Sequence, residues 1–316
     1  MFDRRFITDA IGRSAETPSD RRNFLRAVGV TGFGVGAAVL TAGAVAPATT
    51  ASAATTTGPS DSAILNFALN LEYLEAEFYL RAVTGAGLAD SLTTGTGTRG
   101  NVTGGRQVNF QTPIIRKYAQ EIAADEKAHV AFLRSALGSV AVSRPAINLD
   151  ASFTAAARAA GLVGPNDQFD VYANEVNFLF GAFIFEDVGV TAYKGAAPLI
   201  SNATFLDAAA GLLSVEAYHA GIIRTTLYSL GVNTPSVYSS IQAISDARDS
   251  LDGATDLDQG IGTSATANLV PTDRNGLSYS RSPGQVLNIA FLNPAPVTSG
   301  GFFPAGVNGP LNTSAG

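Results

Sequence analysis

Hydrophobic and polar positions along the middle of the chain follow the pattern of long helices with one apolar face. Four long helices are predicted, over about residues 61–83, 113–138, 169–193 and 201–231. Ser60 or Asp61 is a suitable N-cap for the first, and Gly85 a suitable stop. The second begins with Thr112 and Pro113, a cap residue followed by proline at the first helical position.

The third predicted helix is the most apolar. The run from Val176 to Phe185 leads directly into Glu186. An isolated carboxylate in such surroundings would be costly to bury. Glu186 is therefore expected to be paired with another group or to bind a metal ion.

Both histidines of the chain stand three residues after a glutamate, in the pairs Glu126 with His129 and Glu216 with His219. Residues three apart lie on one face of a helix, so each pair can direct a carboxylate and an imidazole to one point. The segments 129–137 and 219–227 also align without a gap, apolar against apolar. The pairs therefore belong to an internal repeat.

The helix before each pair carries a glutamate followed seven residues later by a tyrosine, namely Glu72 with Tyr79 and Glu186 with Tyr193. Seven residues are close to two helical turns, so each Glu and Tyr share a face. Two single glutamates and two Glu-x-x-His pairs make the ligand set of a two-metal centre in a four-helix bundle. Because oxygen ligands outnumber imidazoles, iron or manganese is favoured over zinc, with two ions per chain.

The connecting segments are long. Residues 85–111 are rich in Gly and Thr, and residues 139–166 form a crossover with a short helix near 152–160. A fifth helix is predicted at 236–251. The last sixty or so residues are rich in Gly, Pro and Ser, but apolar islands at 286–292 and 300–304 argue against disorder. The predicted fold is all-α, a four-helix bundle over 54–234 with a long crossover, and 235–316 as an additional helix and irregular extension packed on the bundle.

The N-terminus contains an export motif. Residues 20–25, Asp-Arg-Arg-Asn-Phe-Leu, resemble the twin-arginine signal, and Ala51-Ser52-Ala53 fits a cleavage site. Residues 1–53 are thus expected to be removed, and the protein to be periplasmic or extracellular. A short membrane anchor is the alternative for this stretch. No other segment is expected to span a membrane.

The composition of the chain limits the classes of molecule that it is expected to bind. The net charge is −6 and basic residues do not cluster, which argues against nucleic acid. Cysteine and tryptophan are absent, and the only methionine is the first residue. A chain without easily oxidised side chains suits exposure to peroxide. Compositional drift explains the same absence equally well.

The four-part motif resembles the ferritin-like superfamily across most of residues 61–230. Within it, residues 65–75, 271–276 and 300–304 are similar to the secreted group that includes desiccation-related proteins. The resemblance implies a ligand set of Glu72, Glu126, His129, Glu186, Glu216 and His219. It also implies that Glu126 and Glu216 bridge the ions, and that Tyr79 and Tyr193 donate to ligand carboxylates.

One position departs from the family pattern. The residue three after the first-helix glutamate is usually small, as Gly189 is after Glu186, but after Glu72 it is Glu75. Glu75 is an extra ligand, a proton relay or the true ligand in place of Glu72. The tyrosine spacing favours Glu72 as the ligand. Arg134 and Arg224, eight residues after their glutamates, are expected at the surface or in salt bridges.

Two functions remain open from the sequence. The first is a di-metal oxidoreductase acting on peroxide, oxygen or ferrous iron in stress or desiccation protection. The second is a non-catalytic structural or stress-binding protein whose metal site only stabilises the bundle. An iron-storage cage is disfavoured by the long loops, and a homo-oligomer of another kind is left open.

Overall fold

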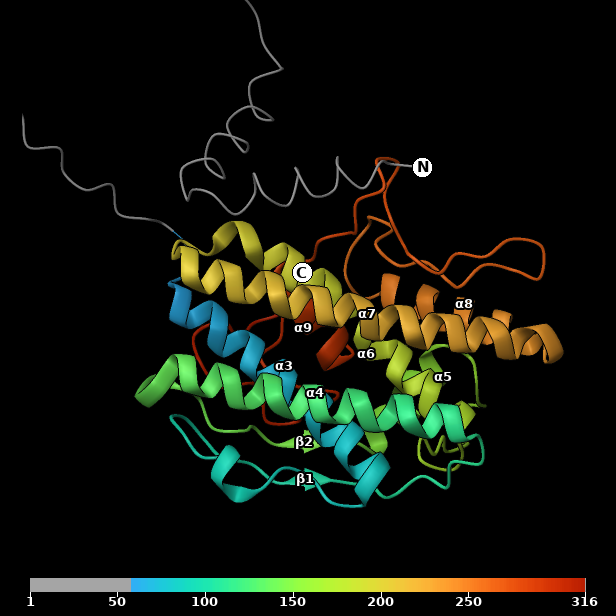
Figure 1. Cartoon of the computed structure of the whole chain (residues 1–316), viewed down its shortest axis with the longest axis horizontal. Coiled ribbons are helices and arrows are strands. Elements are labelled where there is room, and N and C mark those ends of the chain that lie inside the picture. The colour runs from blue at the N-terminus through green and yellow to red at the C-terminus, as the bar shows by residue number, and fades with distance from the viewer. Residues whose placement is uncertain (1–57, 316) are drawn as a thin grey trace, which may run out of the picture. The chain divides into compact units, whose positions relative to one another are not determined.

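The computed structural model describes residues 58–315, so the predicted signal segment 1–53 lies outside the described residues. Four helices form the bundle (Figure 1): α3 at Asp61–Thr84, α4 at Pro113–Leu137, α6 at Glu175–Ala196 and α7 at Ala203–Asn233. Helix α3 packs mainly on α4, and α6 mainly on α7, while α3–α6 and α4–α7 contacts join the two pairs. The all-α bundle is as predicted.

The helix starts follow from capping side chains. Ser60 accepts a hydrogen bond from the Ala63 amide at the start of α3. Asn202 does the same for Thr204 and Phe205 at the start of α7. Helix α6 begins at Glu175, later than the predicted Phe169, because the Asn174 side chain caps the amides of Val176 and Asn177. A side-chain cap thus sets this boundary more strongly than the apolar pattern.

The long connections contain short regular segments. Helix α5 (Ala151–Ala159) lies in the crossover between α4 and α6. Strands β1 (Val102–Thr103) and β2 (Ile147–Asn148) pair in parallel, with Val102 opposite Ile147. The pairing joins the α3–α4 loop to the crossover. Single 3₁₀ turns occur at Asp90–Leu92, Gly138–Val140 and Ala197–Leu199.

The C-terminal extension packs on the bundle and is more regular than predicted. Helix α8 spans Ser236–Asp249, close to the prediction, and helix α9 spans Pro283–Phe291 within the segment expected to be irregular. A capping box between Ser282 and Gln285 starts α9. Phe302 and Phe303 are fully buried. Further on, Asn308 exchanges hydrogen bonds with the buried Asn70 of α3.

Buried ion pairs attach this extension to α6 and α7. Asp187 of α6 accepts from Arg224 of α7 and Arg248 of α8. Arg281 pairs with Asp252 and Asp258. Of the two alternatives expected for Arg224, the salt bridge is found. The surface position is not, because Arg224 is fully buried. Breaking such a pair on one side costs about 3–5 kcal/mol, because a charge is left uncompensated.

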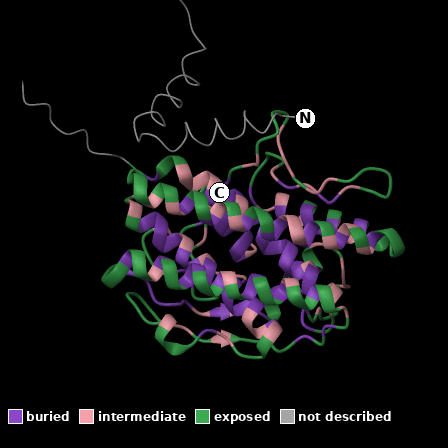
Figure 2. Ribbon diagram, viewed as in Figure 1, coloured by how far each residue is buried: buried purple, intermediate pink, exposed green. Residues whose placement is uncertain are grey.

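Helix α6 is unusually apolar along its length. Among the described residues, Glu175–Leu199 is one stretch whose length and composition would allow a membrane span, contrary to the sequence expectation. However, 78% of its most apolar window is buried inside the fold. Figure 2 shows this burial along the inward faces of the bundle helices. The apolarity of α6 is that of a core helix.

Candidate metal centre

Each helix of the bundle places one glutamate in its interior. Glu72 lies on α3, Glu126 on α4, Glu186 on α6 and Glu216 on α7, and all four are at most 1% exposed. The two histidines, His129 on α4 and His219 on α7, are also buried. Carboxylates of this kind are rarely buried together unless a cation or proton compensates them.

The first cluster of ligand atoms surrounds His129. Its Nδ1 atom lies 3.2 Å from Glu72 Oε2, 3.5 Å from Glu126 Oε2 and 3.7 Å from Glu216 Oε1. One ligand atom from each of these four residues lies within 4.8 Å of the others. Three carboxylates and one imidazole thus converge from three helices.

The second cluster surrounds His219. Its Nδ1 atom lies 2.9 Å from Glu126 Oε1 and 3.6 Å from Glu186 Oε2. Glu126 belongs to both clusters, with one oxygen facing each histidine. This is the position that a carboxylate bridging two ions would occupy. Glu216, the other expected bridge, groups with the first cluster.

Unpaired buried atoms indicate that the clusters fit metal ions. Within residues 58–315, both oxygens of Glu126, both oxygens of Glu216, Oε2 of Glu186 and Nδ1 of His219 are buried without a hydrogen-bond partner. Buried polar atoms are nearly always paired, so a group of them in one place needs an explanation. Carboxylate and imidazole donors in this ratio suit iron or manganese. The six sequence-predicted ligands are brought together, and metal binding by them stays a prediction.

The two tyrosines cross-link the halves of the bundle. Tyr79 of α3 donates a hydrogen bond to Glu186 of α6, and Tyr193 of α6 donates to Glu72 of α3. Each tyrosine therefore bonds to the glutamate of the opposite helix and not to the glutamate seven residues before it on its own helix. These bonds hold one oxygen of each carboxylate and leave the other facing a histidine.

Asp125 is a part of the site that the sequence analysis missed. Its Oδ2 atom lies 3.2 Å from Nε2 of His219. An ionised carboxylate only accepts hydrogen bonds, so a neutral His219 carries its proton on Nε2 and keeps Nδ1 free as a ligand. The available signal was an acidic residue directly before Glu126, where the second repeat has Val215.

Glu75 lies beside the centre but outside both clusters. It is buried, and it belongs to neither group of ligand atoms. Gly189 separates it from Glu216: a Cβ atom at Gly189 would lie 2.3 Å from Glu216 Oε2 and 3.5 Å from Glu75 Oε1. The absent side chain at Gly189 thus makes room for the Glu216 carboxylate. The clusters contain Glu72 and leave Glu75 out.

Burial dominates the electrostatics of the carboxylates. It raises the pKa of Glu72 to about 7, helped by repulsion from Glu126. It raises the pKa of Glu186 to about 8, against the attraction of His219. The pKa values of Glu75 and Glu216 are raised well above the usual range by burial and by neighbouring carboxylates. In the absence of cations these groups favour their protonated forms.

The pKa of the shared Glu126 is lowered, and the pKa values of the two histidines are raised. Burial raises the pKa of Glu126, but the nearby imidazoles of His129 and His219 outweigh it and bring the value to about 2. Burial lowers the pKa of His129, yet Glu72 and Glu126 raise it to about 11. Glu186 and Glu126 likewise raise the pKa of His219 to about 9. In the metal-free site, protonated imidazoles supply positive charge beside the carboxylates. Metal binding would release these protons, because an imidazole must be neutral to act as a ligand.

Comparisons with known proteins agree with this geometry. A family model described as "Ferritin-like domain" matches residues 60–229. The chain is 32% identical to desiccation-related protein PCC13-62 of Craterostigma plantagineum over 254 residues, covering 75% of this chain and 80% of that protein. It is 28% identical to ferritin-like catalase Nec2 of Nesocodon mauritianus over 267 residues, covering 79% and 84%. No solved structure gives a significant match.

Proposed function

Because the chain belongs to the ferritin-like family, in the group that includes desiccation-related proteins, we propose that it is a two-metal carboxylate protein that disproportionates hydrogen peroxide. The observation that carries the proposal is the set of unpaired, buried ligand atoms around Glu126. The name of the relative, ferritin-like catalase Nec2, supports peroxide as the substrate. Iron and manganese both suit the ligands.

Glu72, Glu126, His129 and Glu216 would hold one ion, and Glu126, Glu186 and His219 the other. When bound, a pair of redox-active ions supplies two-electron exchange with peroxide. Disproportionation needs no further reductant, since two peroxide molecules yield two water molecules and one dioxygen. Tyr79 and Tyr193 orient the ligand carboxylates, and the apolar core of the bundle excludes bulk water from them.

A small cavity beside Glu75 supports a small substrate. It has a volume of about 30 Å³, and Glu75 is the charged residue among apolar neighbours from α3, α6 and α9. A single water needs roughly 10–15 Å³ measured in this way, so the cavity suits a molecule the size of hydrogen peroxide. An aromatic substrate would not enter. Glu75 can hold a proton on its carboxyl group and pass it to a substrate oxygen there.

The export motif and the names of the relatives support a setting for this activity. Twin-arginine export would place the protein in the periplasm or outside the cell. Removal of peroxide there would protect the envelope under drying or oxidative stress, in keeping with the name of the relative, desiccation-related protein PCC13-62. A chain that lacks cysteine and tryptophan would itself resist the oxidant.

The test is oxygen release from hydrogen peroxide by the full chain loaded with iron or manganese, measured with an oxygen electrode. Elemental analysis should find about two ions of one redox metal per chain. The double variant Glu216→Ala, His219→Ala removes ligands from both clusters and should lose at least about 100-fold in rate.

A matched control is Glu121→Gln, on the exposed face of α4, which should keep the parent rate. Zinc or no metal in the purified protein would contradict the redox proposal. Equal oxygen release by the parent and the double variant would do so as well. Either result would favour the structural alternative, in which a metal ion only stabilises the bundle.

A further inference from the structure

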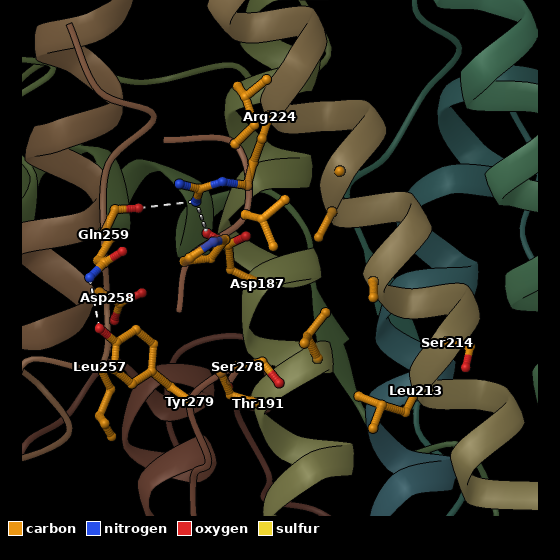
Figure 3. Close-up of a pocket in the computed structure, with 17 residues that line it drawn as sticks. Asp187, Thr191, Leu213, Ser214, Arg224, Leu257, Asp258, Gln259, Ser278 and Tyr279 are labelled. Atoms are coloured by element: carbon orange, nitrogen blue, oxygen red, sulfur yellow. Dashed lines mark hydrogen bonds and ion pairs between the residues drawn. The ribbon is translucent and has the colours of Figure 1, made fainter. Parts of the chain in front are cut away.

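A second pocket lies between helices α6 and α7 and the C-terminal residues 257–279 (Figure 3), with a volume of about 240 Å³. None of the six proposed metal ligands lines it. Two of its wall residues, Asp187 and Ala217, directly follow the ligands Glu186 and Glu216, so the pocket and the metal centre use different faces of the same helices. The pocket is thus a distinct site.

Short side chains on α7 create the space. Ser214, Ala217 and Gly221 lie three and four residues apart, and therefore on one face of the helix. A Cβ atom at Gly221 would contact nothing within 4 Å. Ser214 and Ala217 are exposed, and Val270 opposite them is 71% exposed. The pocket therefore opens to solvent between α7 and the extension.

The mouth leads into a wider surface groove. The groove has a volume of about 630 Å³ and shares Ser214, Ala217, Gly221 and Val270 with the pocket. Tyr118 and Tyr218 also line it, and Tyr218 is 73% exposed. Aromatic side chains at an opening offer an apolar surface with a polar tip to an incoming molecule.

Three residues that line the pocket, Asp187, Arg224 and Asp258, each have a buried side-chain atom without a hydrogen-bond partner, although Asp258 Oδ1 lies 2.7 Å from Arg248. Asp187 Oδ2 accepts from Arg224 and Arg248, but its Oδ1 atom is buried without a partner among the described residues. The Nη atoms of Arg224 are taken up by Asp187 and by the backbone carbonyls of 259, 260 and 268, while Nε is unpaired. Figure 3 shows Arg224 and Asp187 adjacent at one end of the pocket. Two adjacent residues of the pocket therefore carry an unpaired acceptor and an unpaired donor.

These atoms define the chemistry of a ligand. A hydroxyl group both donates and accepts a hydrogen bond, so it can satisfy Asp187 Oδ1 and Arg224 Nε together. The buried ion-pair network is already neutral, so an additional ionic group would be buried without compensation. It contains three arginines and three aspartates: Arg224, Arg248, Arg281, Asp187, Asp252 and Asp258. Elsewhere the wall is mainly apolar, with the ring of Tyr279 beside Leu257 and with Leu213 on the opposite side of the pocket (Figure 3).

We propose that this pocket binds a small neutral aromatic alcohol, whose hydroxyl group donates to Asp187 and accepts from Arg224 while its ring lies against the leucines. The proposal is independent of the metal centre and of peroxide chemistry. It predicts recognition of a phenol-sized molecule by shape and by one hydroxyl group.

The test is calorimetric titration of the full chain, at fixed metal content, with p-cresol, toluene and benzoate as probes. p-Cresol should bind at least about tenfold tighter than toluene, which lacks the hydroxyl group, and than benzoate, which carries a charge. The variant Ala217→Leu fills the pocket from an exposed position and should weaken p-cresol binding at least about tenfold. Ala210→Leu makes the same change on the exposed side of α7, outside the pocket, and should bind like the parent.

Equal affinity for p-cresol and toluene would overturn the assignment of hydroxyl recognition. Equal affinity of Ala217→Leu and Ala210→Leu for p-cresol would overturn the assignment of the pocket. Circular dichroism of both variants verifies that they are folded before the titrations are compared.

Discussion

His219 Nε2 lies 3.2 Å from Asp125 Oδ2, so the imidazole of α7 is held by a carboxylate of α4. The other ring nitrogen, Nδ1, faces Glu126 and Glu186. Asp125 thus orients one histidine of the centre, while Val215 occupies the equivalent position before Glu216 in the second repeat. The two halves of the site have similar ligands, but they differ in the residue that precedes the Glu-x-x-His glutamate.

The variant Asp125→Asn tests whether Asp125 orients His219 for metal binding. The amide can present a donor where the carboxylate accepts, which opposes the tautomer that leaves Nδ1 free. We expect metal affinity to fall about 10–100-fold at the His219 cluster, with the fold intact because Asp125 is partly exposed. Competition with a chelator measures the affinity. Glu121→Gln on the same helix is the control, and equal affinities in all three proteins would contradict the role of Asp125.

Glu126 and Glu186 should differ in their effect on metal stoichiometry. Glu126 belongs to both clusters and Glu186 to one. Glu126→Gln should therefore reduce both ions, from about two per chain towards none, whereas Glu186→Gln should leave about one. Elemental analysis after dialysis distinguishes the outcomes. An equal loss in both variants would show that the clusters do not share a ligand as the geometry indicates.

Gly189→Ala should disturb the centre although glycine binds nothing. The new Cβ would lie 2.3 Å from Glu216 Oε2, so the carboxylate must move away from its position. We expect at least about tenfold weaker metal binding. Gly211→Ala on α7 is the matched control, because nothing lies within 4 Å of its Cβ. That variant should bind metal normally and gain up to about 1 kcal/mol of helix stability.

The metal-free protein should become less stable as the pH rises from about 5 to 9. Glu72 and Glu186 have folded pKa values raised to about 7 and about 8, so the folded state binds more protons than the unfolded state above pH 4.5. His129 and His219, with raised pKa values, contribute stability that is likewise lost at higher pH. Stability due to Glu126 is lost only as the pH falls towards about 2.

Melting temperatures of the metal-free chain between pH 5 and 9 measure this dependence. Glu186→Gln, which resembles the protonated acid, should show a smaller decline with pH. The metal-loaded protein should show a smaller decline too, because its ligands are already deprotonated. A melting temperature that rises with pH in the metal-free protein would contradict the charge balance described for the site.

Much of the centre was predictable because its patterns are local to single helices. The Glu-x-x-His pairs and the seven-residue spacing of Glu72 and Tyr79 depend only on helical geometry. The tyrosine bonds were less accessible, since each joins residues more than a hundred positions apart. The contact between Asp125 and His219 similarly depends on how α4 meets α7.

In the C-terminal extension, amino-acid composition predicts less regular structure than is found. Helix α9 lies in a segment rich in Gly, Pro and Ser, yet Ser282, Pro283 and Gln285 form a recognisable helix start. Arg224 was expected at the surface or in a salt bridge, and its burial comes from residues 259–268, which cover it from a distant part of the sequence. Such cover is a tertiary property that no periodicity in α7 encodes.

The hydrogen bonds between Asn308 and Asn70 connect the end of the chain to the first helix of the bundle. During synthesis, α3 is made more than two hundred residues before Asn308. The complete set of hydrogen bonds around Asn70 can therefore form only after Asn308 has left the ribosome. A change near residue 308 would consequently act on a helix that was made much earlier.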